Sequence, residues 1–305
     1  MRTNQLGKSG INISALTLGC MSLGTDAKKA EDMIDLALDR GINHLDTADL
    51  YDFGTNEEIV GQAIKGKRDK IVLTTKVGNH FNKDIGDWCW DPSFKHITEG
   101  VKESLRRLGT DYIDFYMLHG GTIDDPIDES IEAFEQLKRD GYIRSYGISS
   151  IRPNVIREYV NRSTIDGVMM QYSMLDRRPE EEILDLLHAN GISVLARGPL
   201  AKGMLSNQAE QKIEEKGQDG FLNHTYKELR SYYEELLAIT SPDKMQELAL
   251  QYVLKHPAVA SAVFGASSID QVKENTSISL NELSNETYLA AQRIIKPIQY
   301  DKHRE

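Results

Sequence analysis

Short β-rich runs alternate with longer segments of helical periodicity along most of the chain, and this alternation limits the possible folds more than any other feature. Eight runs predict strands at Ala15–Leu18, Ile42–Leu45, Lys70–Thr75, Ile113–Leu118, Ile143–Ile148, Gly167–Met170, Ser193–Ala196 and Val259–Phe264. Helices are predicted near residues 28–40, 55–65, 93–108, 128–140, 152–162, 180–190, 243–256 and 268–275. Eight strand–helix units predict an α/β fold, the (β/α)8 TIM barrel.

A doubly wound sheet is the rival for such an alternation. Its G-x-G-x-x-G fingerprint after the first strand is missing, and so is a P-loop, so the barrel is favoured. Three helix starts have local support. Thr55 with Glu58 and Ser268 with Gln271 have the spacing of a capping box, and Ser241-Pro242 is typical of an N-cap followed by proline.

Two segments lie outside the repeat. Asn4–Ile13 is predicted to form an N-terminal hairpin that plugs the bottom of the barrel. Leu205–Thr240 is a long polar and charged insertion after strand seven, in which Glu234–Leu237 is expected to be helical. Loops of this length at the top face of a barrel commonly serve as lids or binding loops. Because there is no linker of low complexity, we expect a single domain over residues 1–305.

Composition excludes several classes of protein. The net charge of −11 argues against general nucleic-acid binding, which needs a basic surface. No apolar stretch approaches the ~20 residues that span a bilayer, and the N-terminus lacks the apolar region of a secretory signal. Two cysteines provide neither a disulfide framework nor a zinc ligand set, and no metal is expected. These observations predict a cytoplasmic protein.

Polar residues follow the predicted strands at their carboxyl ends, where barrel enzymes have their active sites. The four with coherent chemistry are Asp46, Tyr51 just beyond it, Lys76 and His119. Ser149, Gln171 and Arg197 occupy the same position after later strands.

Hydride transfer to a carbonyl carbon leaves charge on the oxygen, which must be protonated. The Tyr51 hydroxyl can supply that proton if a cation lowers its pKa from about 10, and Lys76 can be that cation. Asp46 would keep the ammonium charged, while His119 would hydrogen-bond the carbonyl oxygen. Taken singly, each residue also has a purely structural interpretation, such as a turn cap or a loop aromatic. Their convergence on one face favours catalysis.

These residues lie in motifs that resemble those of the aldo-keto reductases, most of all the bacterial general-purpose reductases. The resemblance rests on the segment GINHLDTADLY at 41–51, NEEIVG at 56–61, DFYMLH at 114–119, YGIS at 146–149, QYS at 171–173, GPLAKG at 198–203 and GASS at 265–268. It covers nearly the whole chain.

The resemblance implies a catalytic tetrad of Asp46, Tyr51, Lys76 and His119 and an NADP(H) cofactor. The residues that it implies for cofactor binding are Gly19, Cys20, Met21, Asp46, Ser149, Gln171, Arg197, Gly198, Pro199, Leu200, Ala201, Lys202, Gly203, Gly265, Ser267, Gln271, Glu274 and Asn275. Among them Ser149 and Gln171 would hold the nicotinamide carboxamide, and the last five would cradle the adenosine phosphate. Gln271 replaces a basic residue of many NADPH-preferring relatives, for which Lys202 or Lys273 would compensate.

The substrate is expected to be a small carbonyl compound that contacts Tyr51 and His119. Trp88 and Trp90, in the loop after Lys76, would wall an apolar pocket, and Gly120-Gly121 would open it beside His119. A second hypothesis is a redox-sensing partner protein that binds the nicotinamide with little turnover. A hydrolase or lyase barrel is the third, but the strand ends lack the metal ligands or paired carboxylates that it needs.

Overall fold

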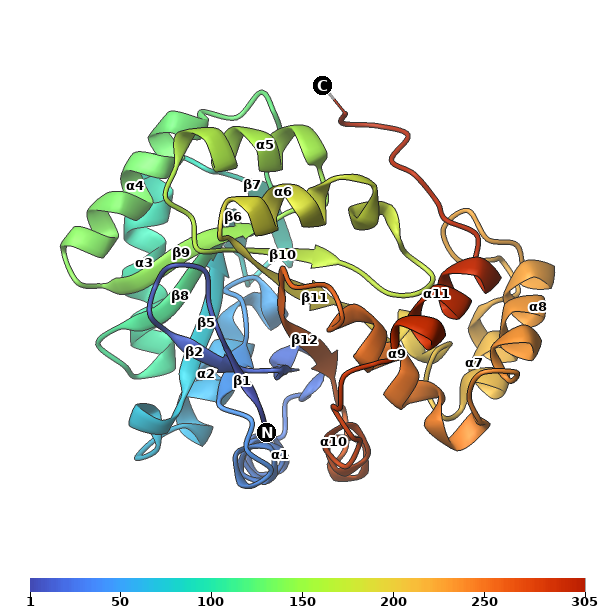
Figure 1. The fold of residues 1–305 in the computed structure, drawn as a ribbon. Coiled ribbons are helices and arrows are strands. Elements are labelled where there is room, and N and C mark those ends of the chain that lie inside the picture. The colour runs from blue at the N-terminus through green and yellow to red at the C-terminus, as the bar shows by residue number, and fades with distance from the viewer. Residues whose placement is uncertain (305) are drawn as a thin grey trace.

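A closed barrel of eight parallel strands forms the centre of the computed structural model, which describes residues 1–304 (Figure 1). The strands are β3 (Leu16–Gly19), β4 (His44–Asp46), β5 (Val72–Val77), β8 (Ile113–Leu118), β9 (Ile143–Ser149), β10 (Gly167–Gln171), β11 (Ser193–Arg197) and β12 (Val259–Gly265). Each strand pairs with the next in this order, and β12 closes the ring on β3. The predicted (β/α)8 fold is confirmed, with all eight strands in place.

Helices surround the barrel because each buries one apolar stripe against it (Figure 1). In α1, for example, buried residues recur at Ala30, Met33, Ile34 and Ala37, the spacing of one helix face. The helices of the repeat are α1 (Ala27–Asp39), α2 (Thr55–Ala63), α3 (Phe94–Leu108), α4 (Ile127–Arg139), α5 (Pro153–Arg162), α6 (Ile183–Ala189), α9 (Met245–Val253) and α10 (Ile269–Thr276). They confirm the eight predicted helices. None of the helices described is long and apolar enough to cross a membrane.

The predicted N-terminal hairpin is present and consists of β1 (Thr3–Gln5) and β2 (Asn12–Ser14). Its side chains Leu6, Ile11 and Ile13 are buried in one apolar cluster with residues of the barrel interior. Burial of each such side chain contributes about 1.5–3 kcal/mol. The hairpin therefore closes the bottom of the barrel, opposite the carboxyl ends of the strands.

A polar layer crosses the barrel interior above this plug. The Thr17 hydroxyl lies 2.7 Å from His44 Nδ1 and 2.6 Å from the Ser261 hydroxyl, and His44 Nε2 lies 2.7 Å from the Thr74 hydroxyl. Burial, together with the nearby Lys76 ammonium, lowers the pKa of His44 to about 3. The ring is therefore neutral at physiological pH, with both nitrogens paired.

The long segment after β11 is more ordered than the sequence indicated. It contains α7 (Ala209–Lys216) and α8 (Tyr226–Leu236), so the helix predicted around Glu234–Leu237 is present but is the end of a longer one. A reciprocal capping box at the start of α8 joins Thr225 and Glu228. Because α7 and α8 contact each other and α8 contacts α11 (Asn285–Ile294), the segment forms a small helical lobe, seen in yellow and orange in Figure 1.

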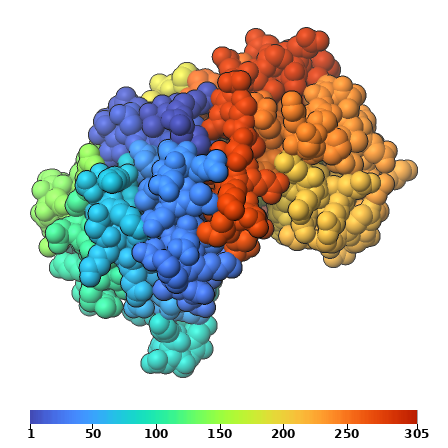
Figure 2. All heavy atoms as spheres, turned by 90° about the horizontal axis from the view of Figure 1, so that it is seen from below, coloured from blue at the N-terminus to red at the C-terminus, as the bar shows by residue number. Residues whose placement is uncertain are grey.

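A second hairpin follows β5, where only a loop was expected. It pairs β6 (Asn79–Asn82) with β7 (Asp87–Trp90) in antiparallel register. In the view of Figure 2 a teal segment of this part of the chain projects from the body of the molecule. Short 3-10 helices occupy Cys20–Ser22, Tyr51–Gly54, Arg68–Lys70, Arg178–Glu181, Ala201–Gly203 and Pro242–Lys244.

The helix caps agree only partly with prediction. Gly54 is the N-cap of α2, so Thr55 lies inside the helix and its predicted capping box with Glu58 is wrong. The Ser268 side chain does cap α10 by accepting from the Gln271 amide, 3.2 Å away. Ser241 and Pro242 begin the short 3-10 helix that precedes α9, although the Ser241 side chain makes no cap hydrogen bond.

Candidate active site

The residues predicted for catalysis meet at the carboxyl end of the barrel. Asp46 ends β4, Lys76 lies near the end of β5, and His119 follows β8 directly. The backbone beyond β4 runs along β5, since the Thr47 amide donates to Thr74 O and the Asp49 amide to Lys76 O. This pairing brings the start of the next 3-10 helix, at Tyr51, over the end of β5.

Lys76 is the buried centre of the group. Its Nζ lies 2.7 Å from Asp46 Oδ1, 2.8 Å from Thr47 O and 3.1 Å from the Tyr51 hydroxyl. Burial disfavours its ammonium, but Asp46 and Tyr51 outweigh that effect and hold the pKa of Lys76 above its usual range. Two hydrogen bonds and the ion pair with Asp46 therefore hold the cation in one position.

The electrostatics of Tyr51 differ from the sequence expectation. Burial raises the pKa of the hydroxyl above its usual value of 10, and Lys76 offsets only part of this rise. Tyr51 therefore stays protonated at neutral pH. A lysine 3.1 Å away still stabilises any negative charge that develops on the phenol oxygen.

His119 faces Tyr51 across the mouth of the site, with ring centroids 5.7 Å apart and the rings nearly perpendicular. Its Nδ1 is buried and has no hydrogen-bond partner among the described residues. Burial, with Lys76 and Arg197 nearby, lowers the pKa of His119 to about 3. The imidazole is therefore neutral, and the edge of the ring that lines the cavity can hydrogen-bond a ligand.

A second buried ion pair supports β5 from behind. The fully buried Glu57 accepts a 2.5 Å hydrogen bond from the Thr75 hydroxyl and lies 2.6 Å from Arg107 Nε. Asp49 lies near this pair, and burial with the charge of Glu57 raises its pKa well above the usual range. No local sequence pattern predicted this pair, because Glu57 and Arg107 are fifty residues apart in the chain.

A cavity of about 850 Å³ begins at Asp46, Tyr51 and His119 and extends toward α10. Most of the residues predicted for the cofactor line it: Gly19, Met21, Asp46, Ser149, Arg197, Gly198, Pro199, Leu200, Ala201, Lys202, Gly203, Gly265, Ser267, Gln271, Glu274 and Asn275. Figure 2 shows the red-orange α10 region and the yellow α7 region facing each other across a hollow. The predicted set is thus largely brought together in space.

A few predicted residues lie elsewhere. Cys20 is fully buried and offers its backbone oxygen to the Asn56 amide instead. Gln171 Oε1 lies 3.4 Å from the Arg197 guanidinium, and Gln171 is outside the lining of the cavity. Trp88 is 52% exposed on the second hairpin, whereas Trp90 is half-buried and also stands outside this lining.

The α7 segment adds two cations that sequence reasoning missed. Lys212 and Lys216 line the cavity together with the predicted Lys202, whereas Lys273 does not line it. Lys216 Nζ donates to Lys202 O, 3.2 Å away, and Lys212 lies 2.6 Å from Glu215. A helix predicted over residues 209–216 would have placed both lysines on one face, because they are four residues apart.

The far end of the cavity is held by amide contacts. Gln271 Oε1 accepts from the Ser267 amide at 2.8 Å, and Asn275 accepts from Gln246 at 3.1 Å. The lysines and the N-terminal end of α10 make this end attractive to an anion. A polar reacting end joined to a cationic end fits a dinucleotide cofactor.

Strained backbone is concentrated in the two loops beside the cavity. Of the six non-glycine residues with positive φ among those described, Asp52 and Phe53 follow Tyr51, and Ala201 and Lys202 lie in the loop after β11. Such conformations cost about 1–3 kcal/mol each and cluster at functional sites. Their placement supports this cavity as the candidate site.

A smaller cavity of about 370 Å³ adjoins the reacting end. It shares Ser149 and Arg197 with the larger cavity and includes Gly120-Gly121, as expected from their lack of side chains. Tyr300, Asp301, Lys302 and His303, near the C-terminal end of the described chain, form its outer wall. The space beside His119 is therefore open on the side where those glycines lie.

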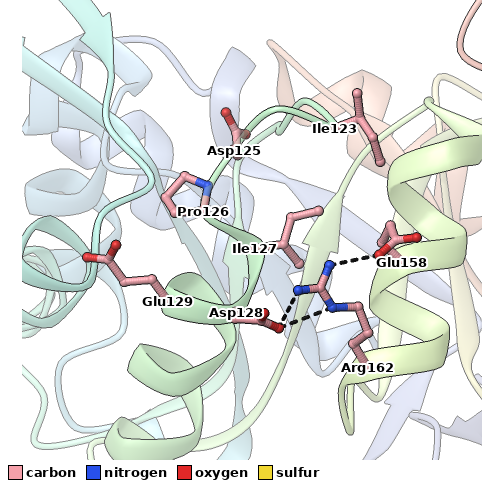
Figure 3. Close-up of a pocket in the computed structure, with 8 residues that line it drawn as sticks. All are labelled: Ile123, Asp125, Pro126, Ile127, Asp128, Glu129, Glu158 and Arg162. Carbon is pink, nitrogen blue, oxygen red and sulfur yellow. Dashed lines mark hydrogen bonds and ion pairs between the residues drawn. The ribbon is translucent and has the colours of Figure 1, made fainter.

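Another hollow, of about 580 Å³, lies between the start of α4 and α5 (Figure 3). Its one cation, Arg162, is held by Asp128 and by Glu158, with 2.8 Å to the latter. The other carboxylates there are engaged as well, since Asp125 accepts from Trp90 Nε1 and Glu129 accepts from the Phe94 amide. This hollow is a surface ion-pair site rather than a candidate for catalysis.

Comparison with known proteins agrees with this geometry. The sequence profile described as the aldo/keto reductase family matches residues 15–296. The chain is 52% identical to the uncharacterized oxidoreductase YqkF of Bacillus subtilis over the full length of both proteins. It is 33% identical to the NADH-specific methylglyoxal reductase of Escherichia coli, over 90% of this chain and 92% of that protein.

A solved structure extends the agreement to three dimensions. The holo form of the aldo-keto reductase AKR11C1 from Bacillus halodurans superposes with a TM-score of 0.94 at 53% identity, covering 100% of both chains. Sequence profile, relatives and structure therefore agree. The chain belongs to the aldo/keto reductase family, whose members are nicotinamide-dependent oxidoreductases acting on carbonyl compounds.

Proposed function

We propose that this protein reduces an aldehyde or ketone with NADPH, reversibly, and that Tyr51 donates the proton to the carbonyl oxygen. The observation that carries the proposal is the position of the buried Lys76 Nζ, within 2.7 Å of Asp46 and 3.1 Å of the Tyr51 hydroxyl at the mouth of the cavity. A bound reduced nicotinamide would supply the hydride to the carbonyl carbon.

Tyr51 is suited to give up a proton only as charge develops on the substrate. Burial keeps its hydroxyl protonated beforehand, and Lys76 stabilises the phenolate once the proton has left. Asp46 keeps the ammonium charged, so the cation is in place before the reaction. His119, which is neutral and lines the cavity, would hydrogen-bond the carbonyl oxygen and fix its direction.

Along the cavity, we assign the cofactor contacts as the sequence resemblance implies. Ser149 would hold the carboxamide, joined by Gln171 if its side chain turns from Arg197 into the cavity. Arg197 would pack against the nicotinamide ring, and the loop Gly198–Gly203 would cover the pyrophosphate. The preference for NADPH over NADH is supported by Lys202, Lys212 and Lys216, which line the same cavity. Three cations favour the additional negative charge of a 2′-phosphate.

The test follows NADPH and NADH oxidation against a panel of aldehydes and ketones, with the wild type and Tyr51→Phe. We expect the variant to lose turnover by about 10²–10⁴-fold and to keep its cofactor affinity, because only proton transfer is removed. Tyr112→Phe is a matched control, since that ring packs against Arg68 outside the cavity lining. Full activity of Tyr51→Phe would exclude Tyr51 as the donor.

The same assay separates the enzyme from the sensing alternative. A wild-type protein that binds NADPH yet reduces no carbonyl compound of the panel would contradict the proposal and favour a redox-sensing partner protein. A lower Michaelis constant for NADH than for NADPH would contradict only the cofactor preference.

A further inference from the structure

Three metal-ligating side chains converge outside the catalytic site. They are His80 on β6, Asp91 just after β7 and His96 in the first turn of α3, and one ligand atom from each lies within 4.8 Å of the other two. It is the one such group among residues 1–304. The two imidazole rings have their centroids 5.4 Å apart.

The hairpin presents these ligands on one face. His80 lies directly across the ladder from Cys89, and side chains alternate along a strand, so both point away from the face of Phe81 and Trp90. On that other face, Phe81 packs near Phe53, with centroids 5.9 Å apart, and Trp90 donates from Nε1 to Asp125, about 3.0 Å away. The ligand face is therefore free of the contacts that root the hairpin.

The ligand atoms are available to a metal ion. His96 Nε2 is buried and has no hydrogen-bond partner among the described residues. Asp91 uses Oδ1 to accept from the Ser93 amide at 3.1 Å, which orients the carboxylate from behind. His80 is exposed, so its ring can move inward toward the ligand spacing of about 3.4 Å in a tetrahedral zinc site.

We propose that His80, Asp91 and His96 form a zinc-binding site that fastens the β6–β7 hairpin to the start of α3. Two imidazoles and one carboxylate make a normal zinc ligand set, with water completing the coordination. The site lies on the opposite side of the hairpin from Trp90, whose ring would meet a side chain at Gly78 and Gly120. Bound zinc thus steadies the wall of the opening beside His119.

The experiment titrates tag-free, chelator-treated protein with ZnCl2 by calorimetry, in a Cys89→Ser background that removes the exposed thiol. We expect one equivalent to bind, with affinity reduced more than tenfold by His80→Ala or His96→Ala. His188→Ala is the matched control. The His188 ring lies 6.4 Å from that of His256, which pairs with Asp185, but the ligand atoms of these three residues do not come close enough together to bind one metal ion. The control is expected to bind as the parent does.

A second readout uses the hairpin itself, because both tryptophans of the chain, Trp88 and Trp90, lie in β7. Co²⁺ in place of zinc is expected to quench tryptophan fluorescence in the parent and not in His80→Ala. Zinc is also expected to slow trypsin cleavage after Lys83, in the turn of the hairpin. Because His80 is exposed, its replacement tests binding without risking the fold.

Absence of binding at one equivalent would overturn the proposal. So would binding that survives both His80→Ala and His96→Ala, since the metal would then occupy another site. Loss of binding in the Cys89→Ser background alone would likewise refute a site made of these three residues.

Discussion

The charged side chains at the two ends of the main cavity differ in their exposure to water. At the reacting end, Lys76 and Asp46 are almost completely shielded from water and are separated by 2.7 Å. At the far end, Lys212 keeps 26% of its side chain exposed and already pairs with Glu215. Buried charges interact strongly and individually, whereas exposed charges are screened by salt and act roughly additively. Substitutions at the two ends should therefore differ in size and in salt dependence.

The largest effect is expected at Lys76. Lys76→Met removes the cation beside Tyr51 and leaves Asp46 buried without a partner, so kcat/KM should fall by about 10³-fold, or roughly 4 kcal/mol. Thermal stability should fall as well. Steady-state kinetics and a melting curve measure both. Lys28→Met, at an exposed pair with Glu31 and Asp32, is the control and should change neither.

The next effect concerns the buried neutral histidine of the polar layer. The pKa of His44 is about 3 in the folded chain against 6.5 when unfolded, so below about pH 6 only the unfolded state takes up this proton. The stabilisation of the folded state by neutral His44 is fully present above pH 6.5. It is lost as the pH falls, by about 1.4 kcal/mol per pH unit.

The measurement compares urea unfolding of the wild type and His44→Gln between pH 7 and pH 5. The variant is needed because Asp49, with its raised pKa, acts with the opposite sign in both proteins. As the pH falls, the free energy of unfolding of the wild type should decrease more steeply than that of the variant, by up to about 1.4 kcal/mol per pH unit. Equal slopes would show that His44 takes up a proton in the folded state too.

A smaller effect is expected at the far end of the cavity. Replacing both Lys212 and Lys216 by alanine should raise KM for NADPH about tenfold at low salt and leave kcat nearly unchanged. The difference should shrink as ionic strength rises, whereas the Lys76 effect should not. An equal increase of KM for NADH would contradict a contact with the 2′-phosphate.

The smallest effect is expected on the second hairpin. Trp88 is 52% exposed, so Trp88→Ala should change kcat/KM for a carbonyl substrate by less than about twofold. Trp90→Ala should raise KM more, because that ring packs beneath Gly78 and Gly120 and is tied to Asp125. Equal effects of the two substitutions would show that the hairpin closes over the substrate.

Much of this architecture was predictable because it follows from local periodicity. All eight barrel strands were located, and Asp46, Lys76 and His119 were placed at one rim because parallel strands share their carboxyl end. The capping box of α8 was also present in the sequence, as Thr225 followed by Glu228, but the polar composition of the segment masked the helix. Because α7 was not predicted, its lysines that line the cavity were not predicted either.

The remainder depends on burial, which a single sequence does not reveal. The rise in the pKa of Tyr51 comes mainly from burial, so the sequence predicted its partner Lys76 correctly and the net direction wrongly. Glu57 and Arg107 are fifty residues apart in the chain, and only the packing of α2 against α3 brings them together. The hairpin register places Trp88 on the same face as Phe81 and Trp90, yet Trp88 is exposed because it lies near the turn of the hairpin.

The outer wall of the cavity beside Arg197 is made by Tyr300 to His303, which come after the last helix of the described chain. These residues belong to no strand or helix of the barrel. Exchange of this tail between relatives would therefore remodel the entrance to the reacting end while the barrel keeps its core. For protein engineering, changes in this tail would alter the entrance without touching the barrel, and an affinity tag is better attached at Met1, on the opposite side of the barrel.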